Sequence, residues 1–396
     1  MSLQSAIMPF PARLKTPLQI DPVLFTVTVA LLLAGLVILA SASMSISDSI
    51  SDNPFFYVER QLLAAALGIG GAFICVLIPM QVWRDLGPLL LLIGIALLVV
   101  VLIPGVGYTV NGSTRWLRFG IMNLQVSEPA RLCILLYIAG YLVRHNKSLR
   151  DSFGGFLRPM LLLVVACGLL LAEPDFGAAI VLVATALAML FVAGARLKDF
   201  FIFFSTAVIA MVALAISSPY RLERVTGFLD PWSDPFDSGF QLTQSLIAIG
   251  RGEWFGVGLG DSVQKLFYLP EAHTDFVFAV FAEEFGLLGS LTLIAAFLVL
   301  LWRIFRLAIR AANSERLFEA YLAVGIGTWL GLQAFINVGV NMGLLPTKGL
   351  TLPLISYGRS SLIMTIISIG ILLRIHHELV VDARPLNRKS SKRRQE

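Results

Sequence analysis

The sequence has little charge, little cysteine and little histidine for its length. Only 14% of its 396 residues are charged, whereas soluble globular domains carry about 25%. Its three cysteines stand singly in apolar runs, and its four histidines lack metal-ligand spacing. These features exclude an ordinary soluble protein and argue against a disulfide framework or a zinc site. A nucleic-acid partner is not expected either.

Long apolar runs take up the room that charge leaves, and 57% of the residues are hydrophobic. The runs have the length of membrane-spanning helices rather than of barrel strands. They predict an all-α polytopic membrane protein with about ten transmembrane helices in one domain, residues 1–383, and a disordered basic tail, residues 384–396. The predicted spans are 22–42, 58–79, 86–104, 129–143, 159–172, 176–193, 200–216, 276–302, 320–340 and 359–377.

The orientation follows from the basic residues, because short cytoplasmic loops are enriched in lysine and arginine. Most of the 30 basic residues then lie inside, together with both termini, and one large loop at 217–275 lies outside before the eighth helix. Within this loop, residues 241–249 predict a short amphipathic helix. Basic residues that fall outside break the bias, so they are candidates for function. Among them are Arg115, Arg131, Lys265, Lys348 and Arg359.

Another outer excursion, residues 104–128, contains turn residues mixed with arginine and tryptophan between Asn111 and Gly120. Two interpretations stay open. The segment is either an interfacial anchor built on Trp116 and Arg118 or an anion-binding lip for a lipid headgroup.

Two predicted spans, 129–143 and 159–172, are short. Each gives only about 21–23 Å of helix, against a hydrocarbon core of ~30 Å, so their outer ends should stop below the outer surface. The ends carry Glu128 with Arg131, and Glu173 with Asp175. Ionisable groups at membrane depth usually face a cavity or a partner. A Glu128–Arg131 pair at i, i+3 is the structural alternative, and it leaves Glu173 and Asp175 without a partner.

The stretch 265–284 returns the large outer loop to the membrane. Thr274 is predicted to cap a helix with Asp275 in its first turn, where the helix dipole keeps the carboxylate ionised. An ionised carboxylate is what a general base needs. Glu283 and Glu284 are predicted to be buried acids whose expected partners are arginines of other spans. Three functions agree with this pattern: an enzyme acting on a lipid-linked substrate at the outer face, a transporter and a scaffold.

Four motifs then point to a family. They are YLPEAHTDF at 268–276, FLDPWSDP at 228–235, EPDFG at 173–177 and LPTKGLTLPLISYG at 345–358. The chain resembles the SEDS (shape, elongation, division, sporulation) family over essentially all ten spans, and the motifs favour its cell-division branch.

The resemblance implies a peptidoglycan glycosyltransferase that polymerises lipid II into glycan strands at the outer face of the bacterial inner membrane, at the division septum. Asp275 matches the essential aspartate, whose implied role is the general base for the attacking sugar C4 hydroxyl, with undecaprenyl pyrophosphate as leaving group. The implied partners are a class B penicillin-binding transpeptidase and other divisome membrane proteins. A divalent cation, Mg²⁺ or Mn²⁺, fits this chemistry, and no organic cofactor is expected. A lipid II flippase and an elongation-type polymerase are the alternatives.

The charge argument and the resemblance together give a predicted set of substrate-binding residues. Two members depart from the family's pattern: Arg131 replaces the usual lysine, and Arg359 replaces a glycine, where it offers a phosphate contact instead of close backbone packing. The predicted set is Glu128, Arg131, Arg115, Glu173, Asp175, Trp232, Asp234, Lys265, His273, Thr274, Lys348, Ser356 and Arg359.

Overall fold

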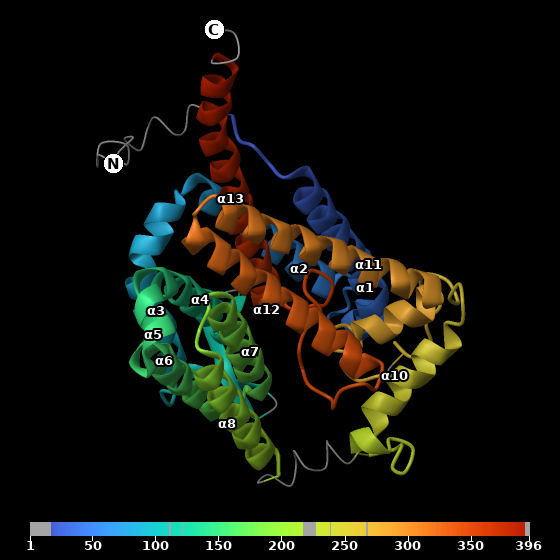
Figure 1. Ribbon diagram of the computed structural model, residues 1–396. Coiled ribbons are helices and arrows are strands. Elements are labelled where there is room, and N and C mark those ends of the chain that lie inside the picture. The colour runs from blue at the N-terminus through green and yellow to red at the C-terminus, as the bar shows by residue number, and fades with distance from the viewer. Residues whose placement is uncertain are drawn as a thin grey trace.

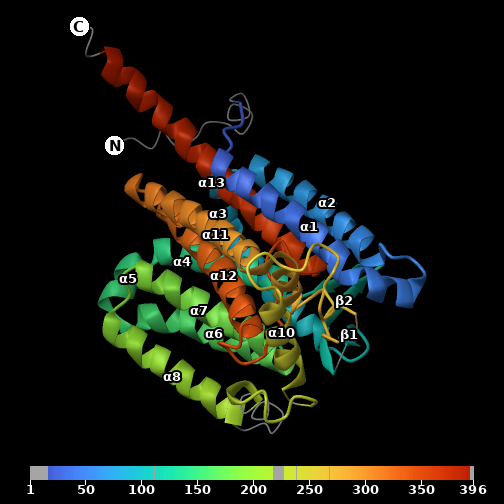
Figure 2. The same ribbon diagram turned by 90° about the vertical axis from the view of Figure 1, so that its right-hand side faces the viewer.

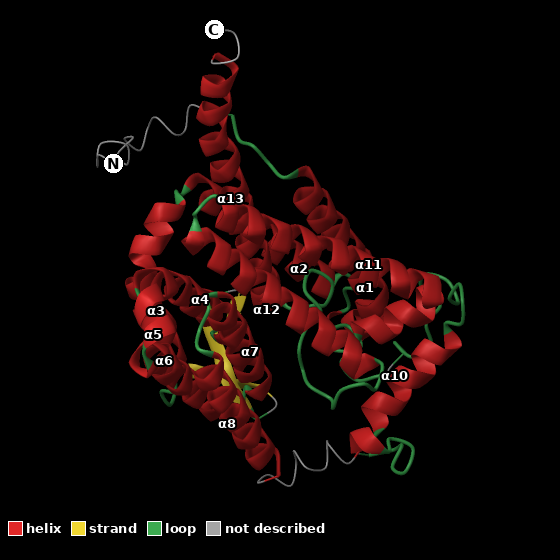
Figure 3. Cartoon of the chain, in the orientation of Figure 1, coloured by secondary structure: helices red, strands yellow, loops and turns green. Residues whose placement is uncertain are grey.

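The computed structural model describes residues 17–110, 112–120, 122–216, 227–237, 239–266 and 268–392. Most of this part of the chain is helical, with one small sheet and several long loops (Figure 3). The helices are α1 (Pro22–Ser51), α2 (Phe56–Leu77), α3 (Met80–Val101), α4 (Ser127–Arg144), α5 (Asn146–Asp151), α6 (Phe153–Ala172), α7 (Phe176–Val192), α8 (Leu197–Ile216), α10 (Phe240–Arg251), α11 (Val277–Asn313), α12 (Leu317–Asn341) and α13 (Arg359–Lys392).

Each predicted span overlaps one helix of the structure, and the predicted amphipathic helix in the large loop is α10. Seven helices are long and apolar enough to cross a membrane, namely α1, α2, α3, α6, α11, α12 and α13. The chain is therefore a mostly helical, multi-pass membrane protein. The number of ten crossings and their orientation remain predictions.

The helices pack in a bundle around α12 and α13. α13 lies along α2, α11 along α12, and α3 along α4 (Figures 1 and 2). α12 and α13 are mostly buried, whereas few residues of α3 are buried, because α3 lies on the outside of the bundle, where lipid would cover it. α1 begins and α13 ends at the same end of the bundle (Figure 1), as an even number of crossings requires. The sheet and α10 lie toward the opposite end (Figure 2).

The sheet corrects the all-α prediction. Strands β1 (Gly107–Val110), β2 (Ser113–Phe119) and β3 (Met122–Gln125) form an antiparallel sheet in the order β1-β2-β3. Gly112, between β1 and β2, has a φ of 74°, and the Asn-Gly pair at this position is a strong hairpin signal. The sequence therefore carries a signal for the sheet, but neither of the two interpretations of this excursion used it.

α11 is broken at Gly286, where φ is 66° and ψ is −163°. Only glycine adopts this conformation readily. In a continuous helix, the N–H groups of Leu287 and Leu288 would donate to the carbonyls of Glu283 and Glu284. The break separates these four groups, and each needs another partner because buried backbone groups are costly to leave unpaired.

The loop at 252–258 supplies those partners by inserting its backbone into the break. Gly252 and Gly256 allow the close approach, since a Cβ added to either would lie within 2.1 Å of a carbonyl oxygen of α11. The break thus exchanges its helical hydrogen bonds for bonds with the loop. These bonds are Leu287 N to Glu253 O (2.9 Å), Leu288 N to Trp254 O (3.2 Å), Val257 N to Glu283 O (3.0 Å) and Gly258 N to Glu284 O (3.1 Å).

The start of α11 differs from the prediction. The helix begins at Val277, and the residue before it, Phe276, makes no side-chain cap. Thr274 Oγ1 donates instead to Glu271, to its backbone oxygen at 3.2 Å and its carboxylate at 2.7 Å. The prediction of Thr274 as the N-cap is wrong because this nearby carboxylate takes its hydroxyl. Asp275 therefore lies in the turn that precedes the helix.

The chain end also differs from the expected disordered tail at 384–396. α13 keeps a helical backbone through Lys392, because a long preformed helix lets further turns propagate at little cost. Residues 393–396 lie outside the described residues.

Candidate active site

Asp275 lies where the C-terminal end of α12 meets the turn before α11. Its backbone carbonyl accepts hydrogen bonds from Asn337 Nδ2 and Asn341 Nδ2, each at 2.9 Å. Both asparagines are buried, and their i, i+4 spacing puts them on one face of α12. Asn341 Oδ1 also accepts from Ala279 N at 3.1 Å. Two buried amides therefore fix both the aspartate and the first turn of α11.

The Asp275 carboxylate faces residues 342–358, the joining segment between α12 and α13. A Cβ added to Gly349 would lie 2.8 Å from Asp275 Oδ2, so a side chain at Gly349 would displace the carboxylate. Asn337 Nδ2 also donates to Leu350 O at 2.6 Å. The same amide thus holds Asp275 and the joining segment together, and the aspartate side chain stays partly exposed.

The joining segment also contacts the start of α7. Lys348 Nζ lies 4.4 Å from the ring centroid of Phe176, which is cation–π geometry. The side chain of Leu350 lies 3.2 Å from the position of an added Cβ at Gly177. The segment therefore connects the Asp275 region with the EPDFG motif.

A second cluster surrounds the start of α7, and Asp175 is its centre. The carboxylate caps α7 by accepting from Ala178 N at 3.1 Å. Arg115 Nη1, on β2, lies 3.9 Å from the same carboxylate. The sheet and the helix are therefore joined through this acid. Asp175 Oδ2 also accepts from Ser127 Oγ (3.1 Å) and Gln125 Nε2 (3.2 Å).

Glu128 and Arg131 form the buried i, i+3 pair that was the structural alternative, with Arg131 Nη1 3.5 Å from Glu128 Oε2. The Arg131 guanidinium also lies 5.1 Å from the Trp329 ring centroid. The pair neutralises itself, while its position beside Asp175 keeps it in the second cluster.

Glu173 is the exception in this cluster. It is fully buried, and neither carboxylate oxygen has a hydrogen-bond partner among the described residues. It occupies the turn between α6 and α7, outside both helices. Burial, and next the neighbouring Asp175, raise the pKa of the Glu173 carboxyl to about 8, although Arg115 opposes the shift. Glu173 is therefore mostly neutral at neutral pH.

His273 is a packing residue between α2 and the segment before α13. Its ring lies 4.5 Å from Tyr57 and 5.8 Å from Tyr357, centroid to centroid. Burial lowers the pKa of His273, although Glu271 opposes the shift, so the ring is neutral at pH 7. Burial raises the pKa of the Tyr357 hydroxyl, and the nearby Arg359 guanidinium opposes this rise.

Lys265 belongs to a different network. Its ammonium donates to Glu284 Oε1 at 2.8 Å, Ser41 Oγ at 2.9 Å and Gly260 O at 2.7 Å. An ammonium has three donors, so this geometry leaves none for a substrate phosphate. Glu283 pairs with Arg251 at 3.2 Å. Both acids are buried, as predicted, but their basic partners, Arg251 and Lys265, come from the large loop rather than from other spans, and one of them is a lysine.

The remaining predicted residues lie in turns. Ser356 Oγ accepts from Leu352 N at 2.8 Å and so stabilises the joining segment. Trp232 and Asp234 lie in the turn before α10, where Trp232 is 58% exposed and Asp234 O accepts from Gly239 N at 3.0 Å. The structure thus places Asp275 beside Gly349, the neighbour of Lys348 in the chain. It groups a second set around the start of α7, namely Glu128, Arg131, Glu173, Asp175 and Arg115.

Sequence reasoning missed the buried amides that organise both clusters. Besides Asn337 and Asn341, Gln333 on α12 accepts from Trp329 Nε1 at 2.9 Å and donates to Thr351 and Ser361 of the joining region. The available signal was the presence of three amides at i, i+4 and i+8 on one face of an apolar helix. Polar groups in such helices face partners rather than lipid.

Fold and site together define a multi-pass membrane protein whose acids gather near one end of its helix bundle. The chain belongs to the FtsW/RodA/SpoVE family of cell cycle proteins, which matches residues 22–380. The family assignment drawn from the motifs is thereby confirmed.

Named relatives and solved structures agree. The probable peptidoglycan glycosyltransferase FtsW of Thioalkalivibrio sulfidiphilus is 57% identical over 90% of this chain and 89% of that protein. That of Coxiella burnetii is 53% identical over 89% and 94%. A chain from a peptidoglycan synthase complex that coordinates polymerization and crosslinking superposes with a TM-score of 0.76, at 31% identity over 92% of this chain and 99% of that one. The rod shape determining protein RodA of Thermus thermophilus gives 0.66, at 29% identity over 91% and 97%.

Proposed function

We propose that this protein is a peptidoglycan glycosyltransferase that polymerises lipid II at the outer face of the bacterial inner membrane during septal wall synthesis. The names of its relatives support the activity. Their identity exceeds that of the RodA structure, which favours the division-type enzyme over an elongation-type one. The observation that carries the site is the anchored Asp275, held by two buried asparagines beside the joining segment.

In the proposed reaction, the Asp275 carboxylate accepts the proton of the C4 hydroxyl on the acceptor sugar. The freed oxygen bonds to the anomeric carbon of the donor, and the bond from that carbon to the pyrophosphate breaks. Undecaprenyl pyrophosphate leaves with the electron pair, so negative charge grows on it and needs cationic partners. Lys348 directly precedes Gly349, which the Asp275 carboxylate faces, and its ammonium lies over the Phe176 ring. We assign Lys348 to the leaving group.

The proposal includes a divalent cation, Mg²⁺ or Mn²⁺, as a cofactor of the pyrophosphate. Among the described residues, no group of three histidine, cysteine, aspartate or glutamate side chains could hold a metal ion. Substrate oxygens would then supply most of its ligands, and no step is assigned to it. The proposed partners are lipid II, the growing glycan strand, a class B penicillin-binding transpeptidase of the FtsI type and other divisome membrane proteins. The similarity to a chain of a complex that couples polymerization to crosslinking supports a crosslinking partner.

Polymerisation of lipid II by the purified protein tests the activity and the base together. We expect the wild type to form glycan strands and Asp275→Asn to lower the rate by at least about 100-fold, the usual contribution of a general base. Asp237→Asn changes an exposed acid of the same outer loop and should retain the wild-type rate. A full rate in Asp275→Asn would overturn the base assignment. Movement of labelled lipid II across liposomes without polymer would favour the flippase.

A further inference from the structure

Two polar networks cross-link α1 and α11 at different heights. At the cytoplasmic end, Arg303 Nε binds both carboxylate oxygens of Asp21 at 2.9 and 2.7 Å, and His376 Nδ1 lies 3.3 Å from Asp21. At the other end, Ser41 Oγ donates to Glu284 Oε1 at 2.6 Å beside Lys265. Charged groups are stable at the edges of the hydrocarbon layer and costly within it.

The spacing of the two networks matches a bilayer. The roughly 20 residues from Asp21 to Ser41 rise about 30 Å at about 1.5 Å per residue, and the hydrocarbon core is ~30 Å thick. From the break at Gly286 to Arg303, α11 rises about 26 Å. A usual helix tilt of about 20° shortens these spans by only about 2 Å. The network at Glu284 therefore marks the outer boundary of the hydrocarbon.

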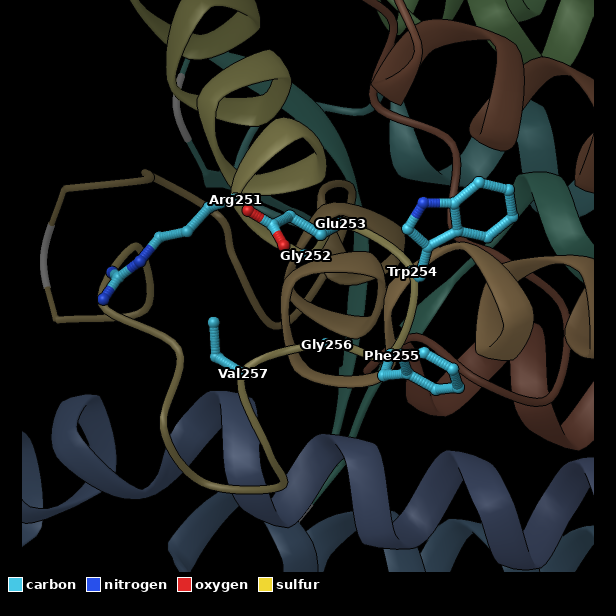
Figure 4. Close-up of a pocket in the computed structure, with 7 residues that line it drawn as sticks. All are labelled: Arg251, Gly252, Glu253, Trp254, Phe255, Gly256 and Val257. Carbon is cyan, nitrogen blue, oxygen red and sulfur yellow. The ribbon is translucent and has the colours of Figure 1, made fainter.

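The loop at 252–258 lies at this boundary, because its backbone is bonded into the break of α11 directly beside Glu284. Trp254 is 64% exposed and Phe255 is 81% exposed. Both rings project to one side of the loop, whereas Arg251 projects to the other, where it pairs with Glu283 (Figure 4). The loop residues also line a pocket of about 600 Å³.

The exposed rings continue the lipid-facing side of α11. After the break, exposed apolar residues recur along this helix at Leu287, Leu288, Leu291 and Leu298, as far as Trp302. Trp302 is 52% exposed and lies under the Arg306 guanidinium at 4.8 Å. Aromatic residues favour both interfaces of a membrane, so this face has an aromatic residue near each boundary.

We propose that the loop 252–258 is an anchor in the outer leaflet, with Trp254 and Phe255 seated among the lipid headgroups and the first carbons of the acyl chains. The occupant of this surface is the phospholipid bilayer itself, since the surface is apolar and continuous with the lipid-facing side of α11. Seated there, the loop stays in the break of α11 and holds the short helical piece 277–285 that follows Asp275. This inference does not depend on the proposed reaction.

Tryptophan fluorescence tests the anchor. The full-length protein is placed in nanodiscs of phosphatidylcholine with a doxyl quencher at acyl carbon 5 or carbon 12, and iodide serves as the aqueous quencher. Subtracting the Trp254→Phe signal from the wild type isolates Trp254. We expect the carbon-5 lipid to quench it at least twice as strongly as either carbon-12 lipid or iodide. Trp302, isolated in the same way through Trp302→Phe, is the matched control for a lipid-facing indole.

Phe255→Ser sharpens the test without removing the probe. Loss of the second ring should roughly halve the quenching of Trp254 by carbon-5 lipid and raise its quenching by iodide. Dominant iodide quenching in the wild type would overturn the anchor by placing the loop in water. Shielding from every quencher would also overturn it, in favour of a protein contact. Because neither readout needs lipid II, a failure of the polymerase assay leaves this result unaffected.

Discussion

The acids at the outer side of this protein fall into two regions that differ in how fully their carboxylates are bonded. Glu283 accepts from Arg251 at 3.2 Å, from Ser262 Oγ and from two backbone N–H groups. Glu173 is equally buried and accepts nothing among the described residues. A buried acid with all its partners in the chain stabilises the fold. One without partners either stays neutral or awaits a group from elsewhere.

Asp275 is held in another way. Its backbone is bonded to α12, and its partly exposed carboxylate faces Gly349 and the joining segment. The position of the carboxylate is therefore fixed through its backbone by buried amides of α12. A general base requires such a fixed position, since its carboxylate must lie within reach of the substrate hydroxyl.

The largest effect on stability is expected from Glu283→Ala. The change leaves the backbone N–H groups of Val263 and Gln264 without their acceptor, and each buried donor without a partner costs about 1–3 kcal/mol. The Arg251 side chain is 45% exposed, so water replaces its lost partner and adds little to this cost. The loop should then leave the break of α11. We expect the midpoint of thermal unfolding to fall by about 5–10 °C, measured in nanodiscs.

The exposed acid Asp237 provides the control, because Asp237→Ala removes a solvent-exposed carboxylate of the same large loop. Its unfolding midpoint should stay within about 1 °C of the wild type. If Glu283→Ala unfolds no earlier than Asp237→Ala, the bonded region does not stabilise the fold and the contrast with Glu173 fails.

A smaller, catalytic effect is expected from Asn341→Ala. The variant loses one of the two amides that hold the Asp275 carbonyl and the acceptor for Ala279 N. Asp275 should then sample more positions, and a displacement of the base typically costs about 10–100-fold. We expect kcat for lipid II polymerisation to fall by that factor while KM changes little.

The double variant Asn337→Ala/Asn341→Ala separates positioning from general destabilisation. Both amides hold the same carbonyl, so the losses in kcat should be smaller together than the product of the single losses, as is usual for residues that act as a unit. If the two single losses in kcat multiply in the double variant and follow only the drop in unfolding temperature, the asparagines have a structural role.

Each of the ten predicted spans overlaps a helix because each long apolar run is a local signal. The sequence also offered the Glu128–Arg131 pair as the structural alternative, since i, i+3 spacing on a helix is local information. The three-stranded sheet was missed although the Asn-Gly turn is visible, because strand pairing depends on contacts between separate segments.

The break of α11 could not be predicted for the same reason. In the sequence Gly286 is one more small residue on a helical face, and nothing near it indicates that the loop at 252–258 enters the helix. The prediction of Thr274 as a cap failed because Glu271 competes for its hydroxyl. Likewise, the three bonds that occupy Lys265 come from Ser41, Gly260 and Glu284, which only the folded chain brings together.

The smallest effect, and the sharpest test of the comparison, concerns Glu173. Its pKa is raised to about 8 by burial and then by Asp175. The stability that goes with its neutral form is complete below the usual carboxyl pKa of about 4.5 and is lost as the pH rises through about 8. Glu173→Gln keeps the neutral shape and cannot ionise. At pH 5 we expect Glu173→Gln and the wild type to unfold at the same temperature. At pH 9 we expect the variant to be more stable than the wild type by about 2 kcal/mol. This is less than the full pKa shift implies, because water entering the site relieves part of the desolvation.

Activity distinguishes the two fates of an acid without partners. If Glu173 works as the neutral form, Glu173→Gln retains most of the polymerisation rate at pH 7, whereas Glu173→Ala loses the hydrogen-bonding group and falls by about 10-fold. A rate lost equally in both variants would mean that the anion is needed, and that a cationic group of the substrate or an ion completes the site. In that case Glu173 would be the acid that the substrate satisfies, just as Arg251 and the outer loop satisfy Glu283.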